Sequence, residues 1–83
     1  MYDLRIRRQA QRELAQLPSG IYEKVRDTVR MLANQPRPAG CRKLKGREGW
    51  RIRAGDYRVI YEIDDQQSTV TVLHIGHRRD VYR

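Results

Sequence analysis

The chain has 83 residues, of which 39% are hydrophobic and 34% are charged, and 18 Lys and Arg against 10 Asp and Glu give a net charge of +8. This length is enough for one domain, residues 1–83, and leaves too few residues for a second core. The single cysteine excludes an intrachain disulfide, and the absence of a long apolar segment argues against a membrane span or a leader peptide, so we expect a cytoplasmic protein.

The first third of the chain predicts one strand followed by two helices. Residues 2–7 alternate between apolar and polar side chains, as a half-buried strand does. From Arg8 the apolar residues recur at helical spacing until Pro18, which ends the first helix. We expect Ser19 or Gly20 to cap a second helix. The apolar stripe of that second helix consists of Ile21, Val25, Val29 and Leu32.

The remainder of the chain predicts a long connection and three strands. Residues 34–49 contain two prolines and three glycines and are interpreted as a loop. Strands are then expected over 49–54, 57–63 and 69–76, joined by tight turns. The order β-α-α-β-β-β predicts an α+β fold, in which two N-terminal helices pack on one face of a small, mainly antiparallel four-stranded sheet.

The positive charge is concentrated in the middle of the sequence. Residues 37–58 contain eight basic and two acidic side chains. A small domain with this charge is expected to bind a polyanion or an acidic protein partner.

Three arginines of the predicted sheet are the first candidate binding residues. Alternation places Arg51 and Arg53 on one face, while Trp50 and Ile52 are expected to pack against the helices on the other. Arg58, on the next strand, can approach the same surface. Arginines gathered in this way suit a phosphate, whose oxygens accept paired hydrogen bonds. The alternative is a set of salt bridges with acidic neighbours or plain solvation, and the candidate partners are Glu62, Asp64, Asp65 and Asp80.

The C-terminal residues carry the second candidate group. His77 and Tyr82 can transfer protons, and Arg78 can stabilise negative charge, although a solvated basic tail explains the same residues. His74 lies inside a predicted strand and is interpreted as a structural or partly buried histidine rather than a catalyst. Two histidines without an acidic cluster predict no metal site, and no motif calls for a cofactor.

Three motifs together resemble the RelE/ParE superfamily of bacterial type II toxins. They are KLKG (43–46), GWRIRAGDYRVIYEID (49–64) and VTVLHIGHRRDVY (70–82). The chain resembles the RelE-type ribosome-dependent messenger RNA endonucleases more than the ParE-type gyrase inhibitors. The resemblance implies cleavage of messenger RNA in the ribosomal A site, by attack of the nucleotide's own 2′-hydroxyl on the adjacent phosphate.

The resemblance also assigns roles to individual residues. It implies that Arg51, Arg53 and Arg58 hold the scissile phosphate. Arg78 would stabilise the transition state, and Tyr82 would activate the 2′-hydroxyl with His77 as an accessory group, because an arginine stays charged and is a poor proton acceptor. The residues expected to bind RNA phosphates non-specifically are Arg42, Lys43 and Lys45.

The expected partners are the ribosome with its messenger RNA and a RelB-like cognate antitoxin with an acidic toxin-binding segment. A toxin–antitoxin heterotetramer that binds operator DNA is compatible with the resemblance. Two other functions stay open, namely a ParE-like inhibitor of DNA gyrase and a non-catalytic basic module that binds nucleic acid.

Overall fold

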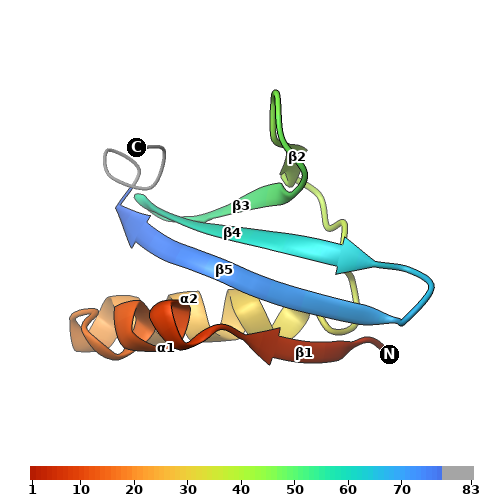
Figure 1. Cartoon of the computed structure of the whole chain (residues 1–83). Coiled ribbons are helices and arrows are strands. Elements are labelled where there is room, and N and C mark those ends of the chain that lie inside the picture. The colour runs from red at the N-terminus through yellow and green to blue at the C-terminus, as the bar shows by residue number, and fades with distance from the viewer. Residues whose placement is uncertain (78–83) are drawn as a thin grey trace.

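The computed structural model describes residues 1–77, and these form one sheet with two helices on one of its faces (Figure 1). The strand order is β1-β5-β4-β3-β2, with β1 parallel to β5 and all other neighbours antiparallel. The predicted α+β class and the order of its elements are therefore confirmed. The elements are β1 (Asp3–Ile6), α1 (Arg8–Ala15), α2 (Ser19–Met31), β2 (Arg42–Lys43), β3 (Trp50–Ala54), β4 (Tyr57–Asp64) and β5 (Thr69–His77).

The sheet has five strands, so the prediction of four was wrong by one short strand. β2 lies inside the segment that was expected to be a loop, and its two residues pair with Arg51 and Trp50 of β3. Two residues are too few to show the alternation that identifies a strand. β2 forms because the loop after α2 returns along the edge of β3, which is a tertiary effect.

The start of α2 also differs from the prediction. Pro18 occupies the N-cap position, Ser19 is already helical, and no side chain caps the helix. The carbonyl of Pro18 accepts the first hydrogen bond, from the N–H of Tyr22 at 2.7 Å. The fixed φ of proline suits this entry to a helix.

The core lies between the helices and the face of the sheet that they cover. Val25 and Val29 of α2 and Leu32, which caps its C-terminal end, are buried there, so the predicted apolar stripe is confirmed, with Ile21 half-buried at its other end. The sheet and α1 complete the cluster with Ala10, Ile52, Ala54, Val59, Tyr61, Val70, Val72 and Ile75.

Two glycines fix the ends of β3. Gly55, with φ +64°, is the first residue of the two-residue turn between Ala54 and Tyr57, where a hairpin favours a positive φ. Gly49, with φ +120°, precedes β3, and a Cβ there would lie 3.1 Å from Cδ1 of Leu44 and 3.3 Å from the carbonyl oxygen of Tyr61. A side chain at Gly49 would therefore force apart the loop and β4.

A polar cluster centred on Asp65 joins four distant parts of the chain. Its carboxylate accepts hydrogen bonds from Arg37, at 2.9 and 3.3 Å, and from the hydroxyl of Tyr2, at 2.7 Å. The guanidinium of Arg37 also lies 5.2 Å from the ring centroid of Trp50. The hydrogen bonds from Arg37, and then that from Tyr2, hold the pKa of Asp65 below its usual value.

Replacing Leu32 by Ala should lower the free energy of unfolding by about 2–5 kcal/mol, because the buried methyl groups leave a cavity. Met31, its neighbour in sequence, is 37% exposed, whereas Leu32 is fully buried. Met31→Ala should therefore change the same quantity by about 0.5 kcal/mol or less. Urea denaturation of the two variants measures both values, and equal effects would contradict this location of the core.

Replacing Asp65 by Asn should destabilise the protein at neutral pH and not at strongly acidic pH. Because the pKa of Asp65 is lowered by folding, its ionised form stabilises the fold above the ordinary carboxyl pKa of about 3.9. That contribution is lost as the pH falls through the lowered value. Urea midpoints of parent and variant should therefore differ at pH 7 and converge on acidification, whereas Asp3→Asn serves as the charge-matched control. A difference that persists at low pH would show that the ionised carboxylate is not the cause.

Candidate functional site

Three arginines share the face of the sheet that the helices leave uncovered. Ile52 on β3 and Val59 on β4 point into the core, so the alternating positions Arg51, Arg53 and Arg58 point to the opposite, outer face. Arg53 lies directly across from Arg58 in the antiparallel ladder. The two Cβ atoms of such a pair are about 4.5–5.5 Å apart, so the guanidinium groups can reach a common ligand.

Arg51 also lines a basic hollow at the edge of the sheet. It pairs with Arg42 of the neighbouring strand β2, so both side chains lie on the same face of the sheet. The hollow has a volume of about 710 Å³ and lies between β2, the start of the following loop and β3. The structure thus gathers the three residues predicted to bind RNA beside Arg51. The lining residues are Cys41, Arg42, Lys43, Leu44, Lys45 and Arg51.

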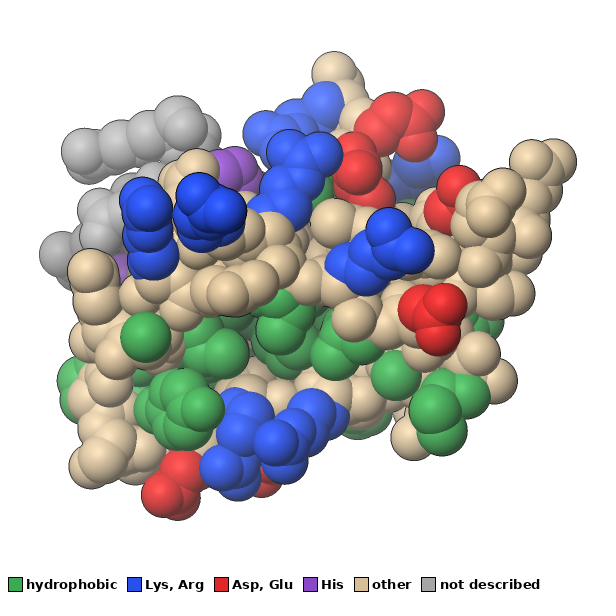
Figure 2. All heavy atoms as spheres, turned by 60° about the horizontal axis from the view of Figure 1, so that its bottom comes forward, with side chains coloured by type: hydrophobic (Ala, Val, Ile, Leu, Met, Phe, Trp, Pro, Cys, Tyr) green, Lys and Arg blue, Asp and Glu red, His purple; other side chains and the backbone are tan. Residues whose placement is uncertain are grey.

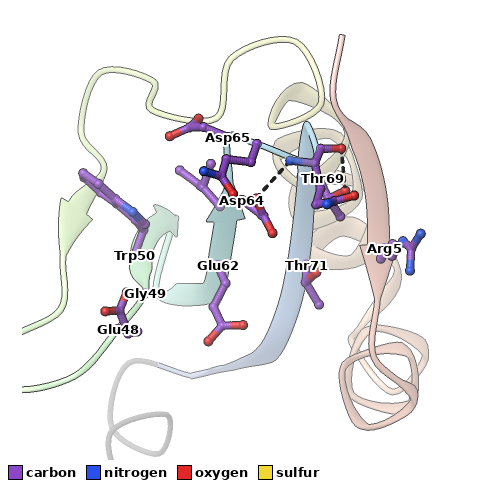
Figure 3. A pocket seen from close by; sticks show the side chains of 12 residues that line it. Arg5, Glu48, Gly49, Trp50, Glu62, Asp64, Asp65, Thr69 and Thr71 are labelled. Carbon is purple, nitrogen blue, oxygen red and sulfur yellow. Dashed lines mark hydrogen bonds between the residues drawn. The ribbon is translucent and has the colours of Figure 1, made fainter.

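Three of the acidic residues considered as salt-bridge partners gather towards the β4–β5 turn. Asp65 is held there by Arg37 and Tyr2. Glu62 and Asp64 line a separate polar hollow of about 640 Å³ towards the β4–β5 turn. Figure 3 shows these carboxylates with Thr69 and Thr71 around that hollow. The outer face therefore has a basic end and an acidic end, and Asp80 lies outside the described residues.

A bulge in β5 changes which histidine belongs to the outer face. The β4–β5 register shifts between Ile60, which pairs with His74, and Tyr61, which pairs with Val72. Leu73 is the extra residue, so Val72 and Ile75 both reach the core although they are three positions apart. His74 consequently lies on the arginine face and is half-buried there.

We expected a structural or partly buried His74, and the side chain is half-buried, but the expectation did not say which face of the sheet it occupies. Regular alternation continued from Val70 and Val72 would put residue 74 into the core. The sequence does carry a signal, because Leu73 follows Val72 without a polar residue between them. Two adjacent apolar residues inside an alternating strand are compatible with a bulge.

The other histidine, His77, lies on the helix side of the sheet. It pairs with Tyr57, and the two rings meet edge to face with centroids 5.5 Å apart at an interplanar angle of 82°. Tyr57 packs against the core cluster. The expected accessory role of His77 beside the arginines is thus not favoured by its position. Arg78 and Tyr82 lie outside the described residues, and their roles stay predictions.

Helix α1 holds the bulged part of β5 in place. The side chain of Glu13 accepts a hydrogen bond of 2.8 Å from the N–H of Ile75. β1 pairs with β5 only as far as Val72, so this carboxylate serves the strand edge beyond the end of β1. Glu13 therefore supports the position of both His74 and the core residue Ile75.

Trp50 and Ile52, which were both expected to pack against the helices, differ in how deeply they are buried. Ile52 packs in the core with the helices as expected, whereas Trp50 is half-buried at its margin and is covered by Arg37 from the loop after α2.

Tyr61 is fully buried, and its hydroxyl donates to the carbonyl oxygen of Pro36 at 2.7 Å. Burial, followed by the neighbouring Cys41, raises the pKa of Tyr61. The buried Tyr61 hydroxyl thus ties the loop after α2 to β4.

The helix side of the molecule carries apolar side chains at its surface. Figure 2 shows a band of hydrophobic side chains across this side, with Lys and Arg side chains on both of its flanks. Within residues 1–77, no helix is long and apolar enough to cross a membrane, and no three His, Cys, Asp or Glu residues are grouped to hold a metal ion. The half-buried apolar residues against the core on β1 and the two helices include Leu4, Ile6, Leu14, Leu17 and Ile21.

Comparison with known protein families gives a match over almost the whole chain. Residues 4–82 match the family model described as ParE toxin of the type II toxin–antitoxin system parDE. Among curated proteins, the chain is 36% identical over 86 residues to toxin RelG of Mycobacterium tuberculosis, covering 99% of this chain and 97% of the relative.

Solved structures show the same fold. The RelBE2 toxin–antitoxin complex of Mycobacterium tuberculosis contains a chain with a TM-score of 0.82 and 31% identity, and the alignment covers 93% of this chain and 98% of that one. The RelE–RelB complex of Pyrococcus horikoshii contains another, with a TM-score of 0.82 and 28% identity, which covers 96% of this chain and 98% of that one.

Replacing Glu13 by Ala should lower the free energy of unfolding by about 1–3 kcal/mol, because the part-buried N–H of Ile75 loses its acceptor. Glu13→Gln keeps a carbonyl oxygen at the same place and should retain most of the stability. Amide hydrogen exchange at Ile75 should become faster in the Ala variant only. Equal protection of this amide in both variants would show that Glu13 does not hold the strand.

Proposed function

Since this chain belongs to the ParE toxin family of type II toxin–antitoxin systems, we propose that it is a ribosome-dependent endoribonuclease that cleaves messenger RNA in the ribosomal A site and so inhibits translation. The observation that carries this proposal is the group of arginines on the uncovered face of the sheet. Arg53 and Arg58 are direct cross-strand neighbours, and Arg51 lies on the same face. This arrangement suits an RNA phosphate.

The proposed reaction is a transesterification within the RNA chain. The 2′-hydroxyl gives up its proton as its oxygen attacks the adjacent phosphorus, and the bond to the 5′-oxygen of the next nucleotide breaks. The departing oxygen takes a proton from water, which leaves a 2′,3′-cyclic phosphate and a 5′-hydroxyl. Negative charge on the phosphoryl oxygens increases in the transition state. Guanidinium groups fixed on a rigid sheet stabilise that charge without reorganising, which is the main electrostatic source of rate enhancement.

The arginines explain phosphate binding but not the proton transfers. An arginine donates hydrogen bonds and stays charged, so it is a poor acceptor for the 2′-hydroxyl proton. We assign Arg78 to charge stabilisation and Tyr82 to activation of the hydroxyl, as the family resemblance implies. A ribosome that holds the RNA in an in-line geometry supplies the positioning that a free strand lacks.

The basic hollow at β2 would bind RNA phosphates without regard to the base sequence. Arg42, Lys43 and Lys45 are all exposed around it, next to Arg51. Contacts of this kind displace counterions from the nucleic acid, so binding should weaken steeply as the salt concentration rises.

An antitoxin is the proposed protein partner. The solved relatives include complexes of RelE with RelB, and we infer a RelB-like antitoxin for this chain. The helix side offers an apolar band between basic flanks (Figure 2), which suits a segment with apolar and acidic side chains. A heterotetramer that binds operator DNA is consistent with this pairing.

Inhibition of DNA gyrase is the second candidate function. It is favoured by the matching family model, which carries the name of the ParE toxins. Induction of the chain would then produce a DNA-damage response and leave messages intact. A non-catalytic nucleic-acid-binding module would produce neither effect.

Replacing Arg58 by Ala should reduce message cleavage by about 10²–10³-fold, because one donor to the transition-state charge is lost. Arg30→Ala is the matched control, since it removes the same charge from an exposed position on α2. Primer extension on messages after induction, with the parent and both variants, measures cleavage. The double variant Tyr82→Phe with Arg58→Ala should abolish it.

Cleavage by the double variant at the parental rate would show that these residues are wrongly assigned. Intact messages together with a DNA-damage response in the parent would replace the endonuclease by the gyrase inhibitor.

A further inference from the structure

The bulge in β5 gives the arginine face a side chain that can accept a proton. His74 reaches this face only because Leu73 is inserted between the pairs Ile60–His74 and Tyr61–Val72. Bulges re-aim side chains and are frequent next to active sites. The retained hydrogen bond from Ile75 to Glu13 shows that the displaced strand is held rather than merely tolerated.

His74 lies within reach of the same phosphate as Arg58. Arg58 pairs with Gly76, and Ile60 pairs with His74, so His74 and Arg58 are diagonal neighbours on the outer face. Diagonal positions are about 7–8 Å apart, a distance that long side chains bridge readily through a ligand between them. Gly76 contributes no side chain, so β5 itself puts none between the two groups.

A buried apolar side chain, that of Ile60, excludes water from this part of the face. Ile60 lies between Arg51 and His74 in one row across the sheet and is only 2% exposed, although it points away from the helix-side core. Hydrogen bonds and charges are stronger where water is excluded. An imidazole beside such a buried apolar side chain is well placed for proton transfer to or from a bound ligand.

We propose that His74 is a further catalytic residue of this face and accepts the proton of the attacking 2′-hydroxyl, an inference that rests on the proposed function. In this step His74 replaces Tyr82 as the proton acceptor, and the role left to Tyr82 is to orient the hydroxyl. The O–H bond of the hydroxyl breaks as its proton moves to an imidazole nitrogen, and the 2′-oxygen forms its bond to phosphorus. The P–O5′ bond breaks, and the departing oxygen takes a proton from water. Arg58 and its neighbours hold the phosphate throughout.

Histidine is the residue type that exchanges protons near neutral pH, whereas the arginines beside it stay charged. His74 therefore adds to this face a function that its arginines lack. The charged groups around it are Arg58 and Glu62 on β4, Arg51 on β3, Arg5 and Arg7 at β1, and Glu13 on α1.

The test is the pH dependence of single-turnover cleavage on ribosomes that carry a message in the A site. His74→Ala and His74→Gln should each lower the rate at neutral pH by about 10²–10⁴-fold and should both lose the rise in rate that the parent shows as histidine deprotonates. Ribosome affinity should change by less than about twofold, because the cationic groups that supply non-specific binding remain. Thr71→Ala, on the same strand and face, is the control and should keep the parental profile.

The outcomes separate the two proposals. If the parent cleaves no message at any pH, the proposed function fails, and the role of His74 in it fails as well. If the parent cleaves and both His74 variants keep its rate and its pH profile, only the assignment of His74 is overturned.

A second measurement uses the parent chain alone, so it tests the proposal even if the His74 variants do not fold. NMR titration of the parent chain with a short 2′-O-methylated RNA should shift the imidazole signals of His74 and leave those of His77, on the opposite face, nearly unchanged. RNA binding that moves the arginine signals and leaves His74 in place would overturn the inference.

Discussion

Side-chain alternation in β3 and β4 is the constraint on which the rest of the structure depends. Each residue buried under α2, such as Ile52 or Val59, commits its neighbours to the opposite face. Because the small core must be filled with apolar side chains from these strands, Arg51, Arg53 and Arg58 are placed on the outer face. A shift of one residue in register would exchange the two sets and destroy both the core and the cationic face.

This face has an electrostatic cost that a ligand can offset. Like charges placed directly across a sheet are destabilising, and Arg53 lies opposite Arg58. Among the described carboxylates that the sequence offered as partners, Asp65 binds Arg37 and Tyr2, and Glu62 and Asp64 line the hollow towards the β4–β5 turn. The arginines of β3 and β4 thus form a concentrated positive charge on the outer face, which is the arrangement expected for a surface that binds an anion.

The sequence predicted the class of the fold, the two helices, four of the five strands and the shared face of the arginines, because each depends on local periodicity. It did not predict β2, whose two residues become a strand only through pairing with β3. It did not predict that His74 shares the arginine face, because alternation carries no warning of where a bulge will form. The cap of α2 was wrong because proline, by its fixed φ, begins the helix without a side-chain hydrogen bond.

The most direct measurement is the structure of the Tyr82→Phe variant bound to a ribosome whose A-site message carries 2′-O-methyl groups and cannot be cleaved. The scissile phosphate should lie on the outer face of the sheet, with its oxygens about 3 Å from the guanidinium nitrogens of Arg53 and Arg58. A message bound against the helices, or against the acidic end of the sheet around Glu62, would contradict the role of the arginine face.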